Sequence, residues 1–469
     1  KLKEDVTWAD GEPFTAADVV FTYEFLANPE VAAATTADYE TVESVEALDE
    51  HTVKINFKDV TPGWDVPFTG QNGMILPKHI FEDYNGENAR EAPANQRPVG
   101  TGPYQVTEFK PGDIVVLAAN EDYWDGVPPF HRVEVKGGGD ATSAARAVLQ
   151  TGDADYAYNL QVEANILEEL ESSPQATGQV SAVFGPYVER IMLNFTDPTI
   201  ATADGERSSV EHPHPFFTDL KVRQAFNLAI DRETIASELY GPTGRATGQL
   251  LVSPESIATD KIRYEYDLEQ AEALLDEAGW TDTNGDGTRD KDGVEMKVVF
   301  QTSVNPVRQK TQEIVKQALE SLGISVELKS VDAGIFFSGD PANTDTVNHF
   351  YADMQMYNTG NGSPDPGPYM KWWTCDQIAQ KENNWQLDNY ARYCNPEYDA
   401  LWEASTTELD AAARNRLFQE MDEFLINDVA VIPIVDRANT NGVGNRLAGV
   451  ESSPWDANTW DIKNWRRAE

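Results

Sequence analysis

One segment, residues 294 to 328, constrains the fold of this chain more than any other. Apolar residues alternate with polar ones at its start, as they do in a strand: Val294, Met296, Val298 and Phe300. An apolar stripe with helical spacing then runs from 307 to 322, Gly323 ends it, and a second alternating run starts at Ile324. Two strands joined by a helix pair in parallel, so this segment predicts a β-α-β unit.

Short strands alternate with amphipathic helices through the rest of the chain. Thr15 to Asp18 forms a capping box, which predicts the start of a helix. The other predicted elements are strands at 104–109, 114–117 and 132–135, a helix at 141–150, and a helix at 417–425 that leads into a buried strand at 429–435. This pattern is typical of the α/β class, and the sequence contains no internal repeat, coiled-coil heptad or low-complexity tract.

The charge of the chain excludes one large class of partners. Its 469 residues, enough for about two to four domains, include 36 Lys plus Arg against 79 Asp plus Glu, a net charge of −43. A protein that binds nucleic acid needs a basic face to neutralise phosphates, so we expect no nucleic-acid partner. The acidic residues are spread along the whole chain, which favours a solvated shell suited to a saline or extracytoplasmic setting over steering of cationic ligands.

The chain has two cysteines, Cys375 and Cys394. Their spacing suits one disulfide that closes a surface loop, worth about 3 kcal/mol through loop-closure entropy. No third Cys or nearby His completes a zinc site, and a single pair fits an exported protein. We therefore expect a disulfide; the alternative is two separate buried thiols.

Several segments carry a further signal through their order and spacing. They are Val6 to Val20 (VTWADGEPFTAADVV), Gly100 to Tyr104, Asn120 to Trp124, His214 to Phe226 with Ala229 to Arg232, Ala271 to Trp280, and Asn395 to Asp399. Each segment is modest alone. Together they resemble, over nearly the whole chain, the family 5 extracellular solute-binding proteins, which are peptide and oligopeptide receptors of bacterial and archaeal ABC importers.

The resemblance implies an α/β fold of the periplasmic-binding-protein type (type II, cluster C), with a cleft between two lobes. It places the first lobe and its extra subdomain at 1–190, the second lobe at 191–436, and a return to the first lobe at 437–469. Members usually carry further residues before the segment at 6–20, so we expect the first lobe to be truncated at its start. A cleft that closes on its ligand excludes water and couples binding to a hinge motion.

We therefore expect a binding protein and no enzyme. The sequence has no HExxH, GxSxG, GxxxxGK[ST] or CxxC motif. The expected protein is monomeric and extracytoplasmic, needs no cofactor, is anchored to the membrane as a lipoprotein, and delivers peptides or peptide-like solutes to an ABC permease. Two alternatives remain: the same scaffold binding an oligosaccharide or another uncharged solute, and a polysaccharide hydrolase whose two carboxylates are hidden among the abundant acids.

The resemblance also indicates where a ligand would bind. In dipeptide receptors of the family, an Asp after an aromatic residue binds the ligand's amino group, and an Arg upstream binds its carboxylate. The matching positions here are Gly360 and Thr302, so neither charged anchor is present. Asp365 offers a replacement carboxylate, although between two prolines it is more typical of a turn. We therefore expect longer peptides held through their backbone, or an uncharged solute, rather than free dipeptides.

Aromatic and polar residues complete the predicted ligand site. Flat rings contribute contact area and stack on peptide bonds or sugar faces, although each ring also suits core packing. The predicted ligand-binding residues are Tyr357, Asn358, Thr359, Gly360, Asn361, Asp365, Trp372, Trp373, Phe184, Tyr187 and Thr302, with Trp385 as a further aromatic candidate.

Residues 282 to 290 match the first nine positions of an EF-hand calcium loop. The candidate ligands are Asp282, Asn284, Asp286, Thr288 and Asp290. The twelfth position holds Gly293 in place of the bidentate Glu, which predicts weakened affinity. A structural calcium ion is one interpretation of this loop, and a solvated Asx-rich turn without metal is the other.

Overall fold

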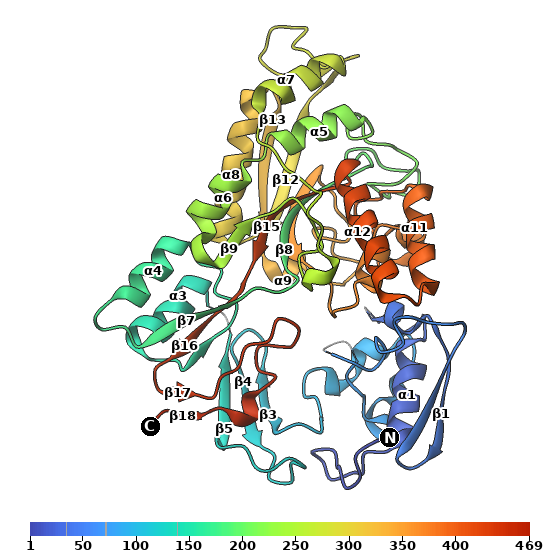
Figure 1. The fold of residues 1–469 in the computed structure, drawn as a ribbon, viewed down its shortest axis with the longest axis vertical. Helices are drawn as coiled ribbons and strands as arrows, with labels where there is room; N and C mark the ends of the chain where they lie inside the picture. The colour runs from blue at the N-terminus through green and yellow to red at the C-terminus, as the bar shows by residue number, and fades with distance from the viewer. Residues whose placement is uncertain (34, 71–72, 138) are drawn as a thin grey trace. The chain divides into compact units, whose positions relative to one another are not determined.

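The computed structural model describes residues 1–33, 35–70, 73–137 and 139–469 (Figure 1). These residues form two compact units. Unit 1 consists of residues 1–160, 170–181 and 441–469, and unit 2 consists of residues 161–169 and 182–440. Each unit has its own sheets and its own buried apolar clusters.

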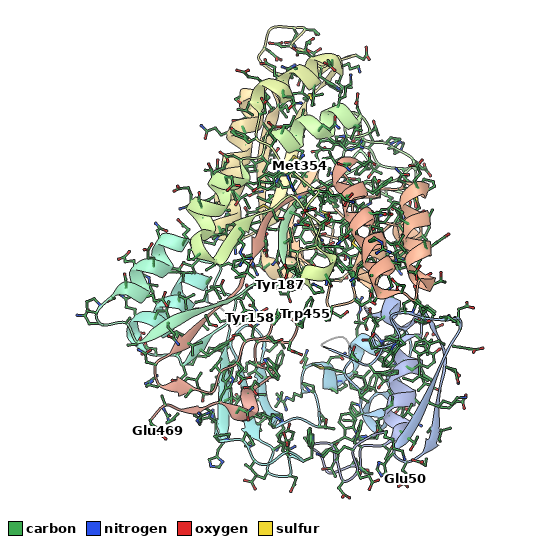
Figure 2. The ribbon with its side chains drawn as sticks, in the orientation of Figure 1. Glu50, Tyr158, Tyr187, Met354, Trp455 and Glu469 are labelled. Carbon is green, nitrogen blue, oxygen red and sulfur yellow. A yellow bond between two sulfur atoms is a disulfide. The ribbon has the colours of Figure 1, made fainter. Side chains whose placement is uncertain are left out.

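Unit 2 is built on a six-stranded mixed sheet with the strand order β13-β12-β14-β8-β15-β9. Strand β12 pairs in parallel with β13 and β14, whereas β8 is antiparallel to β14 and β15, and β15 is antiparallel to β9. Met354, labelled in Figure 2, is fully buried in this sheet. The strands are Val188–Leu193 (β8), Gly244–Ala246 (β9), Lys297–Ser303 (β12), Ser325–Val331 (β13), Met354–Thr359 (β14) and Val431–Arg437 (β15).

Strand β12, helix α8 (Pro306–Ser321) and strand β13 form the β-α-β unit that the sequence predicts, and the parallel pairing is confirmed. The side chain of Asn305 caps α8 by accepting a hydrogen bond from the Arg308 amide at 3.0 Å. Pro306 follows at the first helical position, where an N–H is not needed. The apolar stripe of α8 packs into a core of unit 2.

Helices cover both faces of the unit 2 sheet (Figure 1). Residues of β8 alternate between the two cores, so that Ile191 and Leu193 serve one and Met192 serves the other. One face packs against α5 (Leu220–Leu228), α7 (Leu268–Glu277) and α8, and the other against α10 (Gly367–Lys371), α11 (Pro396–Thr407) and α12 (Ala411–Asn427). The predicted helix and buried strand between 417 and 435 are confirmed as α12 and β15.

Unit 1 combines a helix-covered hairpin with small sheets. Helix α1 (Ala16–Leu26) begins with the predicted capping box and packs on the hairpin of β1 (Val42–Asp49) and β2 (Thr52–Phe57). The three strands predicted between 104 and 135 form an antiparallel sheet, and β16 lies between β6 and β7 in a second sheet. Their bounds are Tyr104–Lys110 (β3), Ile114–Ala119 (β4), Arg132–Lys136 (β5), Tyr156–Ala157 (β6), Gly178–Val183 (β7) and Asn439–Gly444 (β16).

Shorter elements connect these parts. The predicted helix at 141–150 is observed as α3 followed by a π-helical turn, Ala147–Thr151. The short helices are Lys78–Phe81 (α2), Ala141–Arg146 (α3), Ala164–Ser172 (α4), Arg232–Ile235 (α6) and Ala333–Phe336 (α9). The two-residue strands are Asp290–Lys291 (β10), Val294–Glu295 (β11), Leu447–Ala448 (β17) and Arg466–Arg467 (β18).

The lobe boundaries predicted from the sequence, 190–191 and 436–437, fall inside β8 and β15. Both strands belong to the unit 2 sheet, and the chain passes between the units at 160–161, 169–170, 181–182 and 440–441. The predicted lobe bounds rest on the family resemblance and stay a prediction. An apolar run shows that a strand is buried but not which sheet it joins.

The predicted disulfide between Cys375 and Cys394 is confirmed. It closes a loop with a sequence separation of 19 residues, which corresponds to about 3 kcal/mol of loop-closure entropy. The Cys375 amide also donates a hydrogen bond to Asp399 of α11 at 3.1 Å. The loop is therefore attached to unit 2 by covalent and polar contacts.

Candidate ligand-binding site

The predicted ligand motif spans the carboxyl end of β14, a strand that is parallel to β12, and the loop that follows it. Ligands of open α/β sheets bind beyond the carboxyl ends of such strands. In the register, Tyr357 of β14 lies opposite Arg190 of β8, and Thr302 of β12 lies opposite Met356. The Thr302 side chain is fully buried and donates a hydrogen bond to the Met356 carbonyl at 2.7 Å, so it helps to hold the strands together.

Gly360 occupies the position of the acidic anchor of dipeptide receptors, and the structure gives a steric reason for glycine. A Cβ atom at this residue would lie 1.8 Å from the Pro186 carbonyl oxygen and 2.5 Å from its carbonyl carbon. Close-packed interiors do not tolerate such overlaps. A carboxylate side chain at 360 therefore requires displacement of the backbone around Pro186.

The loop after β14 is held by its own polar side chains. Asn361 is almost completely buried and donates hydrogen bonds to the carbonyl oxygens of Ser253 at 3.0 Å and Ser363 at 2.8 Å. Asp365 forms an ion pair with Arg414 and accepts a hydrogen bond from the Gly367 amide at 2.8 Å. The contacts of Asp365 are those of a residue that stabilises the start of α10, and its role as a replacement anchor stays a prediction.

Arg190 lies at the centre of an aromatic cluster that contains three of the predicted ligand residues. Its guanidinium carbon lies 5.0 Å from the ring centre of Tyr357, 5.6 Å from Tyr369, 6.0 Å from Trp372 and 5.7 Å from Trp373. Arg190 Nη1 donates a hydrogen bond to the Tyr369 hydroxyl at 2.5 Å. We call Arg190 and these four rings the Arg190 cage. The cage links β8, β14 and the segment around α10 within unit 2.

Glu189 precedes Arg190 in β8 and contributes to the opposite face of the sheet, as alternation along a strand requires. Its Oε1 lies 2.9 Å from Arg308 Nη2 and 3.5 Å from Arg437 Nη1, and all three residues are buried. Burial disfavours the charged form of Arg308, but the attraction of the Glu189 carboxylate outweighs it and raises the pKa of Arg308. Arg308 Nη2 also reaches the predicted ligand residue Asn358 at 3.4 Å. We call Glu189, Arg308 and Arg437 the Glu189 triad.

The other predicted aromatic residues lie in different surroundings of unit 2. The Arg245 guanidinium covers the Phe184 ring at 3.6 Å. Tyr187, labelled in Figure 2, accepts a hydrogen bond at its carbonyl from the Arg437 amide at 2.9 Å, and the Trp385 ring lies 4.1 Å from the His349 ring. The cage therefore collects Tyr357, Trp372 and Trp373, while ligand contacts of Phe184, Tyr187, Thr359 and Trp385 stay predictions.

Arg190, Glu189 and Arg308 are not among the site residues that the sequence motifs predict. Glu189 and Arg190 stand side by side inside Val188–Leu193, a strand whose other four residues are apolar. A charged pair inside an otherwise apolar strand indicates that each charge is held by a partner in the fold. That signal is present in the sequence, whereas the identity of the partners depends on strand pairing.

The candidate calcium loop folds back on its own backbone. The Asp282 carboxylate accepts hydrogen bonds from the amides of Gly285 at 2.7 Å and Gly287 at 2.9 Å, and Asp286 accepts one from Thr288 at 2.8 Å. These backbone contacts lower the pKa of Asp282. In the parts of the chain that the structure describes, no three His, Cys, Asp or Glu side chains gather to hold a metal ion. Calcium binding by Asp282, Asn284, Asp286, Thr288 and Asp290 stays a prediction.

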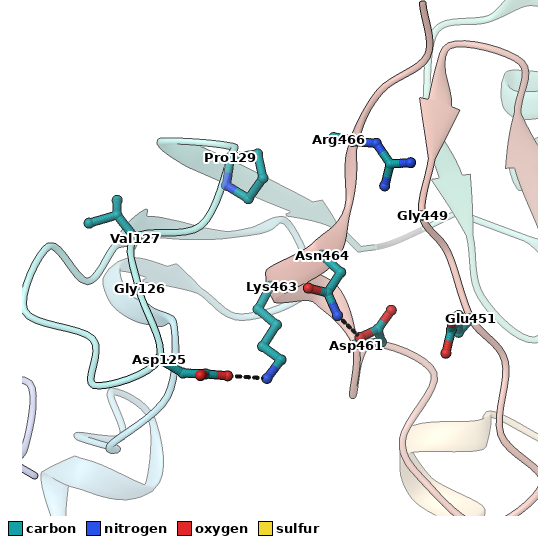
Figure 3. A pocket seen from close by; sticks show the side chains of 10 residues that line it. All are labelled: Asp125, Gly126, Val127, Pro129, Gly449, Glu451, Asp461, Lys463, Asn464 and Arg466. Carbon is teal, nitrogen blue, oxygen red and sulfur yellow. Dashed lines mark hydrogen bonds and ion pairs between the residues drawn. The ribbon is translucent and has the colours of Figure 1, made fainter.

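Unit 1 contains a polar hollow of about 490 Å³ (Figure 3). Two polar contacts join residues of its lining: an ion pair between Asp125 and Lys463, and a hydrogen bond that Asn464 donates to Asp461. Glu451 and Arg466 add further charges to the lining. The predicted ligand residues are absent from this lining, because all of them belong to unit 2.

The buried carboxylate of Asp422 makes the stability of unit 2 depend on pH. Asp422 of α12 is fully buried, and its two oxygens accept hydrogen bonds from the Leu250 and Leu251 amides, each at 3.1 Å. Burial raises the pKa of Asp422 to about 7, although these hydrogen bonds oppose the shift. The folded chain therefore binds more protons than the unfolded chain from about pH 4 to pH 7, and this group's contribution to stability falls as the pH rises through that window.

We expect the Asp422→Asn variant to lose this pH dependence. Between pH 4.5 and pH 7.5, the difference in unfolding free energy between wild type and variant should shift in favour of the variant by on the order of 2 to 4 kcal/mol. Urea denaturation of both proteins at several pH values measures this difference. Parallel stability curves for the two proteins would contradict the expectation.

Comparison with known proteins identifies the class to which this fold belongs. A sequence profile for bacterial extracellular solute-binding proteins, family 5 (middle region), matches residues 1–381. The chain therefore belongs to the family 5 extracellular solute-binding proteins, which are transporter binding proteins rather than enzymes. The fold class predicted from the sequence, an α/β protein of the two-lobed solute-binding type, is confirmed.

Individual relatives give the similarity more detail. The oligopeptide-binding protein AppA of Bacillus subtilis is 31% identical over 477 residues, which cover 99% of this chain and 80% of AppA. The structure of Bacillus subtilis AppA in complex with a nonapeptide matches with a TM-score of 0.84 at 25% identity and covers 100% of this chain and 86% of that chain. NikZ from Campylobacter jejuni in complex with Ni(L-His) matches with a TM-score of 0.81 at 24% identity, over 99% of this chain and 86% of that chain, which shows a shared fold.

The family is extracellular or periplasmic. Within the described residues, no helix combines the length and the apolar character required to span a bilayer.

Proposed function

We propose that this chain is the binding component of an ABC importer, which captures a peptide outside the cytoplasm and passes it to permease subunits in the membrane. The observation that carries the proposal is the similarity, over nearly the whole chain, to AppA, whose structure contains a nonapeptide. The chain acts as a monomer anchored at the membrane, performs no bond chemistry and needs no cofactor. Capture occurs by closure of two lobes around the peptide.

The residues at the end of β14 support a peptide longer than two residues. The steric limit at Gly360 and the buried, hydrogen-bonded Thr302 leave these two positions without the charged groups that hold both ends of a dipeptide. A longer peptide gains binding free energy along its backbone and depends less on its ends.

Mass spectrometry of small molecules released by denaturing the purified protein tests this proposal. A closed binding site retains its ligand through purification when dissociation is slow. We expect peptides of several residues in the released fraction. Release of a defined oligosaccharide without peptide would replace the peptide by a sugar as the solute, and cleavage of offered peptides or glycosides would contradict a binding function.

We also propose that the loop at 282–290 binds calcium weakly and stabilises unit 2. Calcium at about ten times its dissociation constant would add about 1.4 kcal/mol to the free energy of unfolding. A melting curve recorded with calcium and with chelator measures this effect, and the Asp286→Asn variant, which keeps the acceptor for the Thr288 amide, should respond less. Identical melting curves with calcium and with chelator would contradict the proposal.

A further inference from the structure

Arg190 has more donors than the surrounding protein uses. Its side chain is fully buried in unit 2, and Nη1 donates to Tyr369 at 2.5 Å. Within the described chain, its Nε and Nη2 atoms have no hydrogen-bond partner, and no carboxylate forms an ion pair with it. A buried guanidinium normally has a carboxylate or a set of carbonyl oxygens as its partner, because burial removes the hydration of the charge.

Two other buried arginines of unit 2 show this usual arrangement. Arg308 has the Glu189 carboxylate at 2.9 Å. Arg232 lies over the Tyr264 ring at 5.3 Å, and its Nε donates to the Pro433 carbonyl at 2.7 Å while its Nη2 donates to Asn227. Glu189 cannot serve Arg190, because adjacent residues of a strand point to opposite faces. Arg190 is therefore a buried cation whose charge is balanced mainly by ring faces.

Besides the Tyr369 hydroxyl, which accepts from Arg190, the walls of the Arg190 cage hold two polar groups that can donate hydrogen bonds. Trp373 Nε1 is buried without a hydrogen-bond partner among the described residues. The Tyr357 hydroxyl interacts with the guanidinium but also lacks a partner of standard geometry in the described chain. Burial raises the pKa of Tyr357, the charge of Asp388 adds to this effect and Arg190 opposes it, so the hydroxyl keeps its proton. A set of N–H and O–H donors around a cation is complementary to an anion.

The cage adjoins the predicted ligand loop, and one ring of its wall is partly exposed. Tyr357 is in β14, three residues before Gly360 and the predicted ligand loop. Trp372 in the cage wall and its neighbour Tyr390, whose ring centres are 6.5 Å apart, are partly exposed, whereas Tyr369 and Trp373 are buried. In the sheet order, β8 is separated by β14 alone from β12, which carries Thr302 at the position of the missing arginine anchor.

We propose that the Arg190 cage binds a carboxylate of the captured solute, with Arg190 Nε and Nη2 and the donors of Tyr357 and Trp373 as its partners. This inference rests on the proposed peptide-binding function. The C-terminal carboxylate of the peptide is the expected occupant, since every unmodified peptide carries one. The cage thus supplies from β8 the cation that Thr302 of β12 does not.

Native mass spectrometry with three peptide libraries tests the proposal. Each library contains peptides of three to nine residues: free acids without Asp or Glu, the same sequences amidated at the C-terminus, and amidated sequences with one Asp or Glu. We expect wild type to bind the free acids at least tenfold more tightly than the matched amides. The wild type could instead bind the amidated peptides with one Asp or Glu more tightly than the other amides, and bind the free acids no more tightly than their matched amides. That result would assign the cage to a side-chain carboxylate.

Variants connect that preference to Arg190. The acid-to-amide ratio should fall to near one in Arg190→Gln and take an intermediate value in Arg190→Lys, because lysine keeps a point charge but loses the planar donor pair. Arg232→Gln is the matched control: it removes another buried guanidinium that lies over a ring, and it should keep the wild-type ratio even where its melting temperature falls. Because each ratio compares two ligands on one folded protein, a general loss of stability does not imitate the effect.

The contradicting results separate the two proposals. Binding of all libraries by wild type without preference, or an unchanged ratio in Arg190→Gln, overturns the carboxylate subsite and leaves peptide binding intact. Failure of wild type to bind any of the libraries overturns both.

Discussion

Replacement of Glu189 by Gln is expected to lower the free energy of unfolding by about 3 to 5 kcal/mol, the range for breaking a buried ion pair. Glu189 is 1% exposed and lies within 4.0 Å of two buried guanidinium groups, Arg308 and Arg437. The variant removes the only carboxylate that pairs with Arg308 in the described part of the chain. Urea denaturation of the wild type and the variant measures the loss.

Two comparisons identify the cause of this loss. Glu277→Gln removes an exposed partner of Lys221 and should cost less than about 1 kcal/mol. Adding Arg308→Met to Glu189→Gln removes the stranded charge and should restore part of the stability, because replacing both members of a buried pair costs less than breaking it. A loss below about 1 kcal/mol for Glu189→Gln, equal to that of the exposed control, would show that the Glu189 triad does not stabilise the fold.

Replacement of Gly360 by Ala is expected to destabilise unit 2 by about 3 kcal/mol or more, at or beyond the usual range for overpacking. The added Cβ would lie 1.8 Å from the Pro186 carbonyl oxygen, so the backbone before β8 or after β14 must move. Because this loop leads to Asn361 and on to α10, we also expect peptide affinity to fall. Thermal and urea denaturation measure the first effect, and titration with the retained peptide measures the second.

Gly102→Ala is the matched control for Gly360→Ala, since a Cβ at Gly102 meets no atom within 4 Å. It should leave stability nearly unchanged. A Gly360→Ala protein as stable as the Gly102→Ala protein would show that the Pro186 backbone does not exclude a side chain at position 360. The absence of an acidic anchor at this position would then have a cause other than steric overlap.

The elements of the fold could largely be predicted from the sequence because periodicity and capping are local properties. The β-α-β unit of β12, α8 and β13 follows from alternation, an apolar stripe and Gly323, all of which lie within one short segment. The capping box at Thr15 is equally local. The position at which the chain passes between units depends instead on which sheet accepts β8 and β15, and that is decided by contacts between distant segments.

The candidate site shows the same limit. The sequence locates the motif at Tyr357 and shows that Gly360 and Thr302 replace charged residues. It does not show that Pro186 excludes a side chain at Gly360, nor that Arg190 is placed opposite Tyr357, because both facts follow from strand register. Asp365 shows the same limit. This carboxylate lies between two prolines, and it forms an ion pair with Arg414, a residue almost fifty positions later in the chain.

We expect this protein to bind a peptide reversibly and to leave it unchanged. Titration calorimetry with a peptide identified from the purified protein, followed by mass spectrometry of the peptide after release, tests this expectation most directly. The expected result is saturable binding of one peptide per chain and recovery of the peptide at its original mass. Absence of saturable binding, or recovery of cleaved peptide, would contradict it.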